Sequence, residues 1–455
     1  MLKIYNTASR KLEEFKPISD TVKIYTCGPT VYSFAHIGNL ASYIYWDLLI
    51  RTLKMNGFRV KRVLNLTDVG HLTSDGDEGE DKLEKGAKRE GKTVYEIADF
   101  YIEAFLRDYR VLNLTEPEVL ARATDYIEED KKAVEKMIEN GFTYETTDGV
   151  YFDTLKFRDY GKFARLDLEG LKAGARVDFN SEKRNVSDFA VWKFILPNEN
   201  HAMRWGFLGR PGYPGWHLEC STIIDTELGG PIDIHTGGID HIPIHHTNEI
   251  AQTFAMTGRE LAKYWLHCDF ITIEGEKISK SLGNIYTLKD LDERGFSALD
   301  YKMWVLSGSY QGTRNFTFES LEAAKNRRLN WKNKIALCYQ GYEPKKNTEN
   351  FARILEGVNN NLNSASAFFE IDNLELSLDD WKKVDELFGL NLIEEAPNLN
   401  EKLAKEIQKR KEAREARDFT TADKIRDELL GQGITLRDTK DGTVWEYNDN
   451  FKKSL

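Results

Sequence analysis

The chain has 455 residues, of which 41% are hydrophobic and 30% charged, a composition typical of a folded globular protein of about three domains. This composition excludes a disordered chain and a collagen, and the net charge of −11 argues against a protein that coats nucleic acid unspecifically, although one basic face could still bind RNA. The sequence contains no apolar run of about 18 residues, so it predicts no membrane span. The N-terminus lacks the apolar core of a signal peptide.

The N-terminal segments alternate between strand and helix patterns. Val22–Thr26 is a short apolar run typical of a buried strand, Leu40–Met55 has helical spacing, and Arg59–Thr67 reads as a second strand. This order predicts a βαβ unit and therefore a parallel sheet. Because such sheets bind ligands at the carboxyl ends of their strands, we expect a site at Cys27 and the residues after it.

The middle of the chain is less regular. Asp75–Lys92 is dense in charge and glycine, and we expect a solvated loop that runs into an exposed helix. Amphipathic helices are predicted over Thr93–Leu112 and Thr124–Asn140. Tyr144–Pro197 is β-rich and aromatic, which indicates an insertion between two halves of the sheet domain, and Arg210–Gly215 is predicted to be a tight loop.

The rest of the chain is mostly helical. A helix over Trp216–Thr226 and a strand over Ile232–His235 lead into Gly237 and Gly238. From Thr317 onward the pattern predicts an antiparallel helical bundle. Its helices are Glu319–Cys338, Thr348–Phe369 and Leu378–Phe388. After the bundle come the highly charged stretch Lys402–Leu430 and a β-like tail at Ile434–Leu436 and Thr443–Tyr447.

The first chemical motif is the run CGPTVYSFAHIGN, which begins at Cys27. His36 and Asn39 open the predicted helix three residues apart and so share one face. A helix N-terminus offers unpaired N–H groups and a partial positive charge, which suit a triphosphate. The alternative for His36 is a histidine that only caps the helix or packs against it.

The second motif is the run EKISKSLGN over Glu276–Asn284. Lys277 and Lys280 lie three residues apart among serines and a glycine. This pattern is typical of a loop whose ammonium groups neutralise charge on a phosphoryl centre. The alternative is an ordinary basic surface loop.

Together, the two motifs resemble the HIGH and KMSKS signatures of class I aminoacyl-tRNA synthetases in both order and separation. Four further segments are similar to the cysteinyl-tRNA synthetase family, and the resemblance spans nearly the whole chain. They are NLTDV at Asn65–Val69, GWHLECS at Gly215–Ser221, HTGGIDHIPIHHTNEIAQ at His235–Gln252, and the C-terminal run ARDFTTADKIRDEL.

The chain also departs from the family pattern. Ile278 replaces the methionine of KMSKS, and Thr247 stands where the family has a glutamate. Further differences lie at Ala41, at Ser42 and at Ser309–Gln311. None of them removes a signature lysine or a residue that the family uses as a metal ligand.

The resemblance implies an α/β fold with a Rossmann-like parallel-sheet catalytic domain, an insertion, a helical bundle and a small anticodon-binding domain. The catalytic domain would occupy residues 1–123 and 206–262 around a connective insertion at 124–205. The later parts would be a stem-contact region with the KISKS loop at 263–316, the bundle at 317–398 and the anticodon-binding domain at 399–455.

The resemblance also assigns four zinc ligands: Cys27, Cys220, His245 and Glu249. Zinc accepts such a mixed set, and the soft sulfurs argue against magnesium or calcium. Spacing alone supports the set weakly, because only His245 and Glu249 are one helical turn apart. Buried core thiols, a capping histidine and an exposed acid are the alternatives, and His246 is the rival imidazole.

Other roles follow from the same resemblance. Cys27, Thr67 and Trp216 would bind the amino acid, and Gly237, Gly238 and Asp240 would receive adenosine. His36, Asn39 and Lys280 would bind ATP with Mg²⁺, and His36, Asn39, Lys277 and Lys280 would be catalytic. We therefore expect a monomeric ligase with one zinc ion, whose substrates are ATP, L-cysteine and tRNA(Cys).

Two other functions stay open. A relative that condenses cysteine with an amino-sugar amine in thiol biosynthesis would share the adenylation site, and an inactive regulator would bind RNA without catalysis. Lys402–Arg417 places basic residues along a helix and favours RNA contact, although a solvated helix is the alternative. The four widely spaced cysteines show no CxxC pattern and favour a reduced, cytoplasmic protein: Cys27, Cys220, Cys268 and Cys338.

Overall fold

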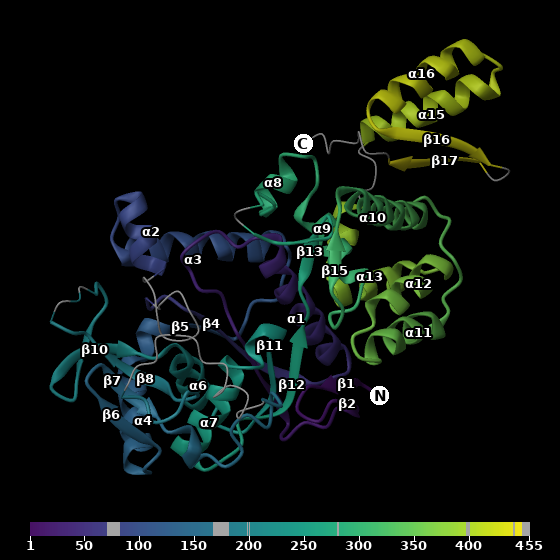
Figure 1. Ribbon diagram of the computed structural model, residues 1–455. Helices are drawn as coiled ribbons and strands as arrows, with labels where there is room; N and C mark the ends of the chain where they lie inside the picture. Colours follow the sequence, from purple (N-terminus) through teal and green to yellow (C-terminus); the bar gives the residue numbers. More distant parts are fainter. Residues whose placement is uncertain are drawn as a thin grey trace.

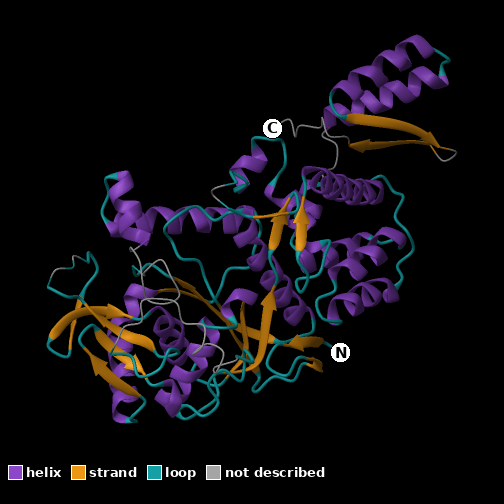
Figure 2. Cartoon of the chain, viewed as in Figure 1, coloured by secondary structure: helices purple, strands orange, loops and turns teal. Residues whose placement is uncertain are grey.

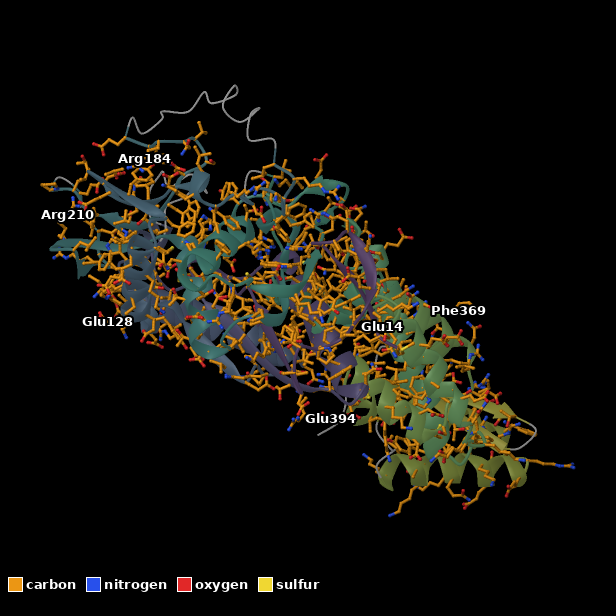
Figure 3. The ribbon with its side chains drawn as sticks, turned by 90° about the horizontal axis from the view of Figure 1, so that it is seen from below. Glu14, Glu128, Arg184, Arg210, Phe369 and Glu394 are labelled. Atoms are coloured by element: carbon orange, nitrogen blue, oxygen red, sulfur yellow. The ribbon has the colours of Figure 1, made fainter. Side chains whose placement is uncertain are left out.

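The computed structural model describes residues 1–70, 82–166, 182–197, 199, 201–279, 282–396, 401–439 and 442–447. The molecule is elongated, with the insertion at one end and the C-terminal elements at the other (Figure 1). Figure 3 labels Glu128, Arg184 and Arg210 at the insertion end and Phe369 toward the opposite end. In the described part of the chain, no helix is long and apolar enough to cross a membrane.

A five-stranded parallel sheet in the order β12-β11-β3-β4-β5 forms the centre, which confirms the predicted fold class. The chain moves outward from β3 to β5 and later returns on the other side of β3, so a topological switch point lies between β3 and β11. The strands are β3 (Thr21–Thr26), β4 (Arg59–Leu66), β5 (Val119–Arg122), β11 (Ile232–Gly238) and β12 (Ala262–Cys268), and α1 (Ile37–Met55) connects β3 to β4.

Apolar side chains cover both faces of this sheet, because successive strand residues point to opposite sides. Ile24 and Leu64 pack into a core that includes α1, whereas Tyr25 and Val63 pack into a second core with Ile223 of α6 (Trp216–Glu227). The sheet is therefore held between helices, and its carboxyl ends remain for a site.

The insertion forms a separate antiparallel sheet in the order β6-β7-β8-β10-β9 (Figure 2). The tight loop predicted at Arg210–Gly215 is wrong, because this segment is a strand between β8 and β9. Its Gly212 is needed there, since an added Cβ would lie 2.3 Å from the Lys193 carbonyl oxygen. The sheet thus extends past residue 205: β6 (Thr143–Thr146), β7 (Gly149–Phe152), β8 (Phe189–Phe194), β9 (Trp205–Phe207) and β10 (Arg210–Pro214).

Helices flank the two sheets. α4 (Ile127–Glu139) shares an apolar core with the insertion sheet. The loop predicted from Asp75 lies partly outside the described residues, but α2 (Lys82–Glu90) is not the exposed helix expected, because Leu83 and Ala87 are buried. Further elements are β1 (Lys3–Asn6), β2 (Lys11–Glu14), α3 (Val94–Val111) and α7 (His245–Thr257).

A small three-stranded sheet in the order β14-β13-β15 leads from the parallel sheet into the helical bundle. The single helix predicted over Thr348–Phe369 is wrong: Asn361 and Leu362 have φ angles of 61° and 54°, which no α-helix accommodates. The elements are β13 (Ile271–Ile273), β14 (Glu276–Lys277), α8 (Leu288–Asp292), α9 (Ala298–Leu306), β15 (Arg314–Phe316), α10 (Phe318–Tyr339), α11 (Thr348–Asn359), α12 (Ser364–Asn373), α13 (Leu378–Phe388) and α14 (Leu392–Glu395).

The C-terminal unit pairs two helices with an antiparallel hairpin, as the β-like tail predicted. The charged stretch is divided at Arg417, whose φ is 61°. The unit consists of α15 (Glu401–Glu415), α16 (Phe419–Gly431), β16 (Ile434–Thr439) and β17 (Gly442–Tyr447).

Candidate functional site

A cavity of about 710 Å³ opens at the carboxyl ends of β3 and β11, where the topology predicts a site. Residues from both signature motifs line it together with residues from α6 and the end of β11. The predicted site residues in its wall are Cys27, His36, Asn39, Trp216, Gly238, Asp240 and Lys277. Thr67 and Gly237 are buried, and Lys280 lies outside the described residues.

His36 caps the N-terminus of α1, which is the alternative that the sequence left open. The backbone N–H of Asn39 donates to Nδ1 of His36 at 3.2 Å, and the N–H of His36 donates to Oδ1 of Asn39 at 3.2 Å. Burial lowers the pKa of His36 and so favours the neutral ring. Because Nδ1 accepts, this hydrogen-bond pattern assigns the proton to Nε2. Capping thus leaves a donor on a ring that lines the cavity.

The second signature begins in β14 of the β13–β14 hairpin, and its Lys277 and Ile278 line the same cavity. Asn284 fixes its loop, since Oδ1 accepts from the N–H of Ser279 at 2.8 Å and Nδ2 donates to the carbonyl oxygen of Lys277 at 3.1 Å. The N–H of Ile37 donates to the carbonyl oxygen of Tyr286 at 2.8 Å. The segment after this loop is therefore tied directly to the first turn of α1.

Four buried side chains converge behind the cavity, and they are the predicted zinc ligands. Cys27 follows β3, Cys220 lies in α6, and His245 and Glu249 lie one turn apart in α7. Their ligand atoms are all within 4.8 Å of one another. Nε2 of His245 is 3.5 Å from Sγ of Cys220 and 3.0 Å from Oε1 of Glu249.

A second set shares Cys27 and Glu249 with the first but contains His235 and His246. Nε2 of His246 is 3.4 Å from Sγ of Cys27, and Nε2 of His235 is 2.7 Å from Oε2 of Glu249. The rival imidazole named from the sequence thus also reaches the cluster. His235 was missed, although its position at the end of a predicted strand, two residues before Gly237, was a usable signal.

The donor set fits a soft divalent cation. Oε1 of Glu249 is fully buried and pairs with Nε2 of His245 at 3.0 Å, without a well-aligned hydrogen bond. Burial raises the pKa of Cys27. The pKa of Cys220 is also raised, mainly by its hydrogen bond with Cys27 and secondly by burial. Two thiols, an imidazole and a buried carboxylate oxygen form an arrangement that zinc would complete, because the cation would favour both thiolates.

Outer hydrogen bonds orient the two imidazoles, as is common around metal ligands. Nδ1 of His217 lies 2.8 Å from Nδ1 of His245, and Nε2 of His267 lies 2.7 Å from Nδ1 of His246. Both contacts leave Nε2 of the inner ring for the cluster. His217 and His267 were not predicted, because their partners are distant in the sequence.

The predicted amino-acid and adenosine residues surround this centre. Oγ1 of Thr67 donates to Oε2 of Glu219 at 3.0 Å, and the ring of Trp216 lies 5.5 Å from that of His245. A Cβ at Gly237 would lie 2.7 Å from Cε1 of His246. The absence of a side chain at Gly237 therefore lets the histidines pack, whereas the exposed Asp240 lines the cavity.

Comparison with known proteins identifies the family of the chain. Residues 14–326 match the family described as tRNA synthetases class I (C) catalytic domain. The chain is 40% identical to the Cysteine--tRNA ligase of Treponema denticola over 98% of this chain and 99% of that protein. It is 42% identical to Cysteine--tRNA ligase 1 of Burkholderia lata over 97% of this chain and 96% of that protein. The Mycobacterium tuberculosis methionyl-tRNA synthetase in complex with methionyl-adenylate has the same fold, with a TM-score of 0.59, 15% identity, and coverage of 83% of this chain and 89% of that chain.

Proposed function

Because the chain belongs to the cysteine–tRNA ligase family of class I aminoacyl-tRNA synthetases, we propose that it activates L-cysteine with ATP and transfers it to tRNA(Cys). ATP, an amino acid and a tRNA are the substrates of such a synthetase. The proposal rests chiefly on one observation: Cys27 and Trp216 share a single cavity with His36 and Lys277 of the two signatures. An amino acid and the phosphates of ATP could therefore meet in that cavity.

In the first step, an oxygen of the cysteine carboxylate attacks the α-phosphorus of ATP, the bond to the bridging oxygen breaks, and pyrophosphate leaves. The carboxylate is already ionised at neutral pH, so positioning and charge stabilisation can carry the step without a general base. His36 would donate from Nε2 to a phosphate oxygen beside Asn39, and Lys277 and Lys280 would stabilise the negative charge that builds up. Mg²⁺ would accompany ATP, and Gly238 and Asp240 would receive the adenosine.

In the second step, a hydroxyl of the terminal ribose of tRNA attacks the carbonyl carbon of the adenylate, and AMP leaves. The C-terminal unit would bind the anticodon. Arg410 of the basic helix is buried and pairs with Asp438 inside this unit, so it does not face RNA, whereas Arg414 pairs with the same carboxylate but is exposed. The exposed Lys402 and Lys411 support RNA contact by the same helix, and the exposed Arg417 follows its end.

We propose that Cys27, Cys220, His245 and Glu249 hold one zinc ion per chain. In the described part of the chain, this is the set that contains both thiols, and the burial and close convergence of its four ligand atoms support it. When bound, zinc supplies a cation that prefers a thiolate to a hydroxyl and so separates cysteine from serine, which an apolar pocket does poorly. Thr67, held by Glu219, and Trp216 would form the walls around the substrate.

Pyrophosphate exchange tests the first step. Exchange should depend on cysteine, be far weaker with serine, and be absent without an amino acid. A charging assay with tRNA(Cys) then tests the second step. Cysteine-dependent exchange without charging would favour the thiol-biosynthesis function, and RNA binding without exchange would favour the regulator. The monomeric state and the cytoplasmic location stay predictions, and light scattering would test the first.

A further inference from the structure

The outer edge of β17 is paired with two side chains of α10 instead of another strand. The N–H of Trp445 donates to Oε1 of Gln340 at 2.9 Å, and Nε2 of Gln340 donates to the Trp445 carbonyl oxygen at 3.0 Å. The N–H of Tyr447 donates to Oδ1 of Asn333 at 2.8 Å, and Nδ2 of Asn333 donates to the Tyr447 carbonyl oxygen at 3.0 Å. Each amide therefore exchanges two hydrogen bonds with β17, as a neighbouring strand would.

This amide clamp, formed by Asn333 and Gln340, satisfies backbone hydrogen-bonding groups that the hairpin leaves unpaired. β16 pairs with one side of β17, which leaves a row of backbone groups on the other side. Asn333 lies in α10 and Gln340 caps its C-terminus seven residues later, about two turns on, so both side chains point to the same side. Ala336 lies between them and packs into one apolar cluster with Trp445 and Leu429.

The opposite end of α10 reaches the catalytic region. The ring of Phe318, its first residue, lies 5.3 Å from the ring of Tyr286, whose carbonyl oxygen accepts from the N–H of Ile37 in α1. At 1.5 Å per residue the helix is about 33 Å long. α10 therefore connects the C-terminal unit with the segment that follows the KISKS loop (Figure 1).

We infer that Asn333 and Gln340 are positioning residues for tRNA, which seat the C-terminal unit at a fixed distance from the catalytic cavity. The inference rests on the proposed function. A tRNA that touches both ends of the protein gains affinity when the two contact surfaces are held at the correct spacing before binding. Without the clamp, the second contact has to order the unit, and tRNA affinity falls while the adenylation site is unaffected.

The test compares the wild-type chain with the double variant Asn333→Leu and Gln340→Met, whose side chains keep a similar size but exchange no hydrogen bonds. We expect KM for tRNA(Cys) to rise about tenfold or more, the scale of one lost docking interaction. The rate of cysteine-dependent pyrophosphate exchange should stay within about twofold of wild type. The single variant Gln340→Glu keeps an acceptor for Trp445 but loses the donor, so its KM should rise by a smaller factor.

Asn330→Leu is the matched control, because Asn330 is an exposed amide on the same helix. Its KM for tRNA should equal that of wild type. An unchanged KM in the double variant, an equal rise in Asn330→Leu, or a parallel loss of pyrophosphate exchange would each overturn the inference. If the wild-type chain itself failed to charge tRNA(Cys), the proposed function would fail instead, so the two failures are distinguishable.

Discussion

Gly38 and Ile278 bring the two signature segments into direct contact: a Cβ added at Gly38 would lie 2.6 Å from Cδ1 of Ile278. The same Cβ would lie 3.0 Å from the ring of His36. The segment that carries Lys277 is therefore packed onto the helix that His36 caps. The methionine position of the family signature is occupied here by a residue that fits above a glycine.

Gly38→Ala should accordingly slow adenylation. The added methyl group has to displace Ile278 or His36, and overpacking of this kind costs about 1–3 kcal/mol. We expect pyrophosphate exchange to fall about tenfold, with no loss of helix stability, because alanine favours a helix more than glycine does. The double variant Gly38→Ala with Ile278→Val removes Cδ1 and should restore most of the rate. Gly206→Ala, with no neighbour within 4 Å, is the control; equal slowing there would contradict the packing argument.

Cys220→Ser should lower the zinc content of the purified protein and raise KM for cysteine. The substitution exchanges a soft thiolate for a weak oxygen ligand. Metal analysis of this variant against Cys338→Ser, a buried cysteine in the helical bundle, checks the effect. Parallel His245→Asn and His246→Asn variants assign the imidazole, and we expect the larger zinc loss for His245. Zinc-free wild-type protein with full activity would refute the metal site.

Lys280→Ala should reduce kcat of adenylation with little change in KM for cysteine, because a phosphate-stabilising charge acts mainly in the transition state. The loss should correspond to about 2–4 kcal/mol, the scale of a missing oxyanion donor. Since Lys280 lies outside the described residues, this expectation rests on the motif alone. Lys289→Ala, a highly exposed lysine of α8, is the control. A kcat of Lys280→Ala equal to that of wild type would indicate that the segment is only a basic surface loop.

Hydrophobic pattern alone predicted the parallel sheet and most helices. Val22–Thr26 and Ile232–His235 were predicted as strands, and both are strands of the parallel sheet that are buried on both faces. The pattern could not show the break at Asn361, because a positive φ at a residue other than glycine has no hydrophobic signature. Pro211 and Gly212 similarly indicated a turn, but pairing with β8 and β9 decided the local structure.

The candidate site could also be predicted only in part. The motifs named Cys27, Cys220, His245 and Glu249, and these side chains do converge. The second set with His235, and the contacts from His217 and His267, depend on how α6, α7 and β12 pack. Long-range packing of this kind cannot be obtained from spacing along one chain.

Asp47→Asn should strongly destabilise the catalytic region. Oδ2 of Asp47 lies 2.8 Å from Nζ of the buried Lys302 and 2.8 Å from Nε of Arg51. Removing the charge leaves both cations without their buried partner, which costs about 3–5 kcal/mol. The free energy of unfolding in urea, measured at pH 7, checks this value. Asp379→Asn, which breaks an exposed pair with Lys346, should change it by less than about 1 kcal/mol.

The pH dependence of this effect has a defined sign. Burial alone would raise the pKa of Asp47, but Lys302 and Arg51 hold it well below its ordinary value of 3.8. A depressed carboxyl pKa stabilises the fold above the ordinary value and loses that contribution as the pH falls toward the lowered pKa. The difference between wild type and Asp47→Asn should therefore shrink as the pH falls below 4. A constant difference down to pH 2.5 would contradict the role of the charge.

Asp108→Asn should stabilise the protein at neutral pH. Burial raises the pKa of Asp108 to about 6, although Arg107 opposes the shift. The residue also lies in the last turn of α3, where the helix dipole disfavours a negative charge. With a raised pKa, the folded state keeps a proton that the unfolded state has lost between about pH 4 and pH 6, so stability falls as the pH rises through this window. The charge costs at most about 1 kcal/mol above pH 6, because the side chain is partly solvated and its interactions are screened.

Urea unfolding should show the gain of Asp108→Asn at pH 7.5 and none at pH 3.5. The control is Glu103→Gln, which changes an exposed carboxylate of the same helix and should leave the free energy of unfolding unchanged at both pH values. An equal gain of Asp108→Asn at both pH values would mean that helix propensity, and not the buried charge, is responsible.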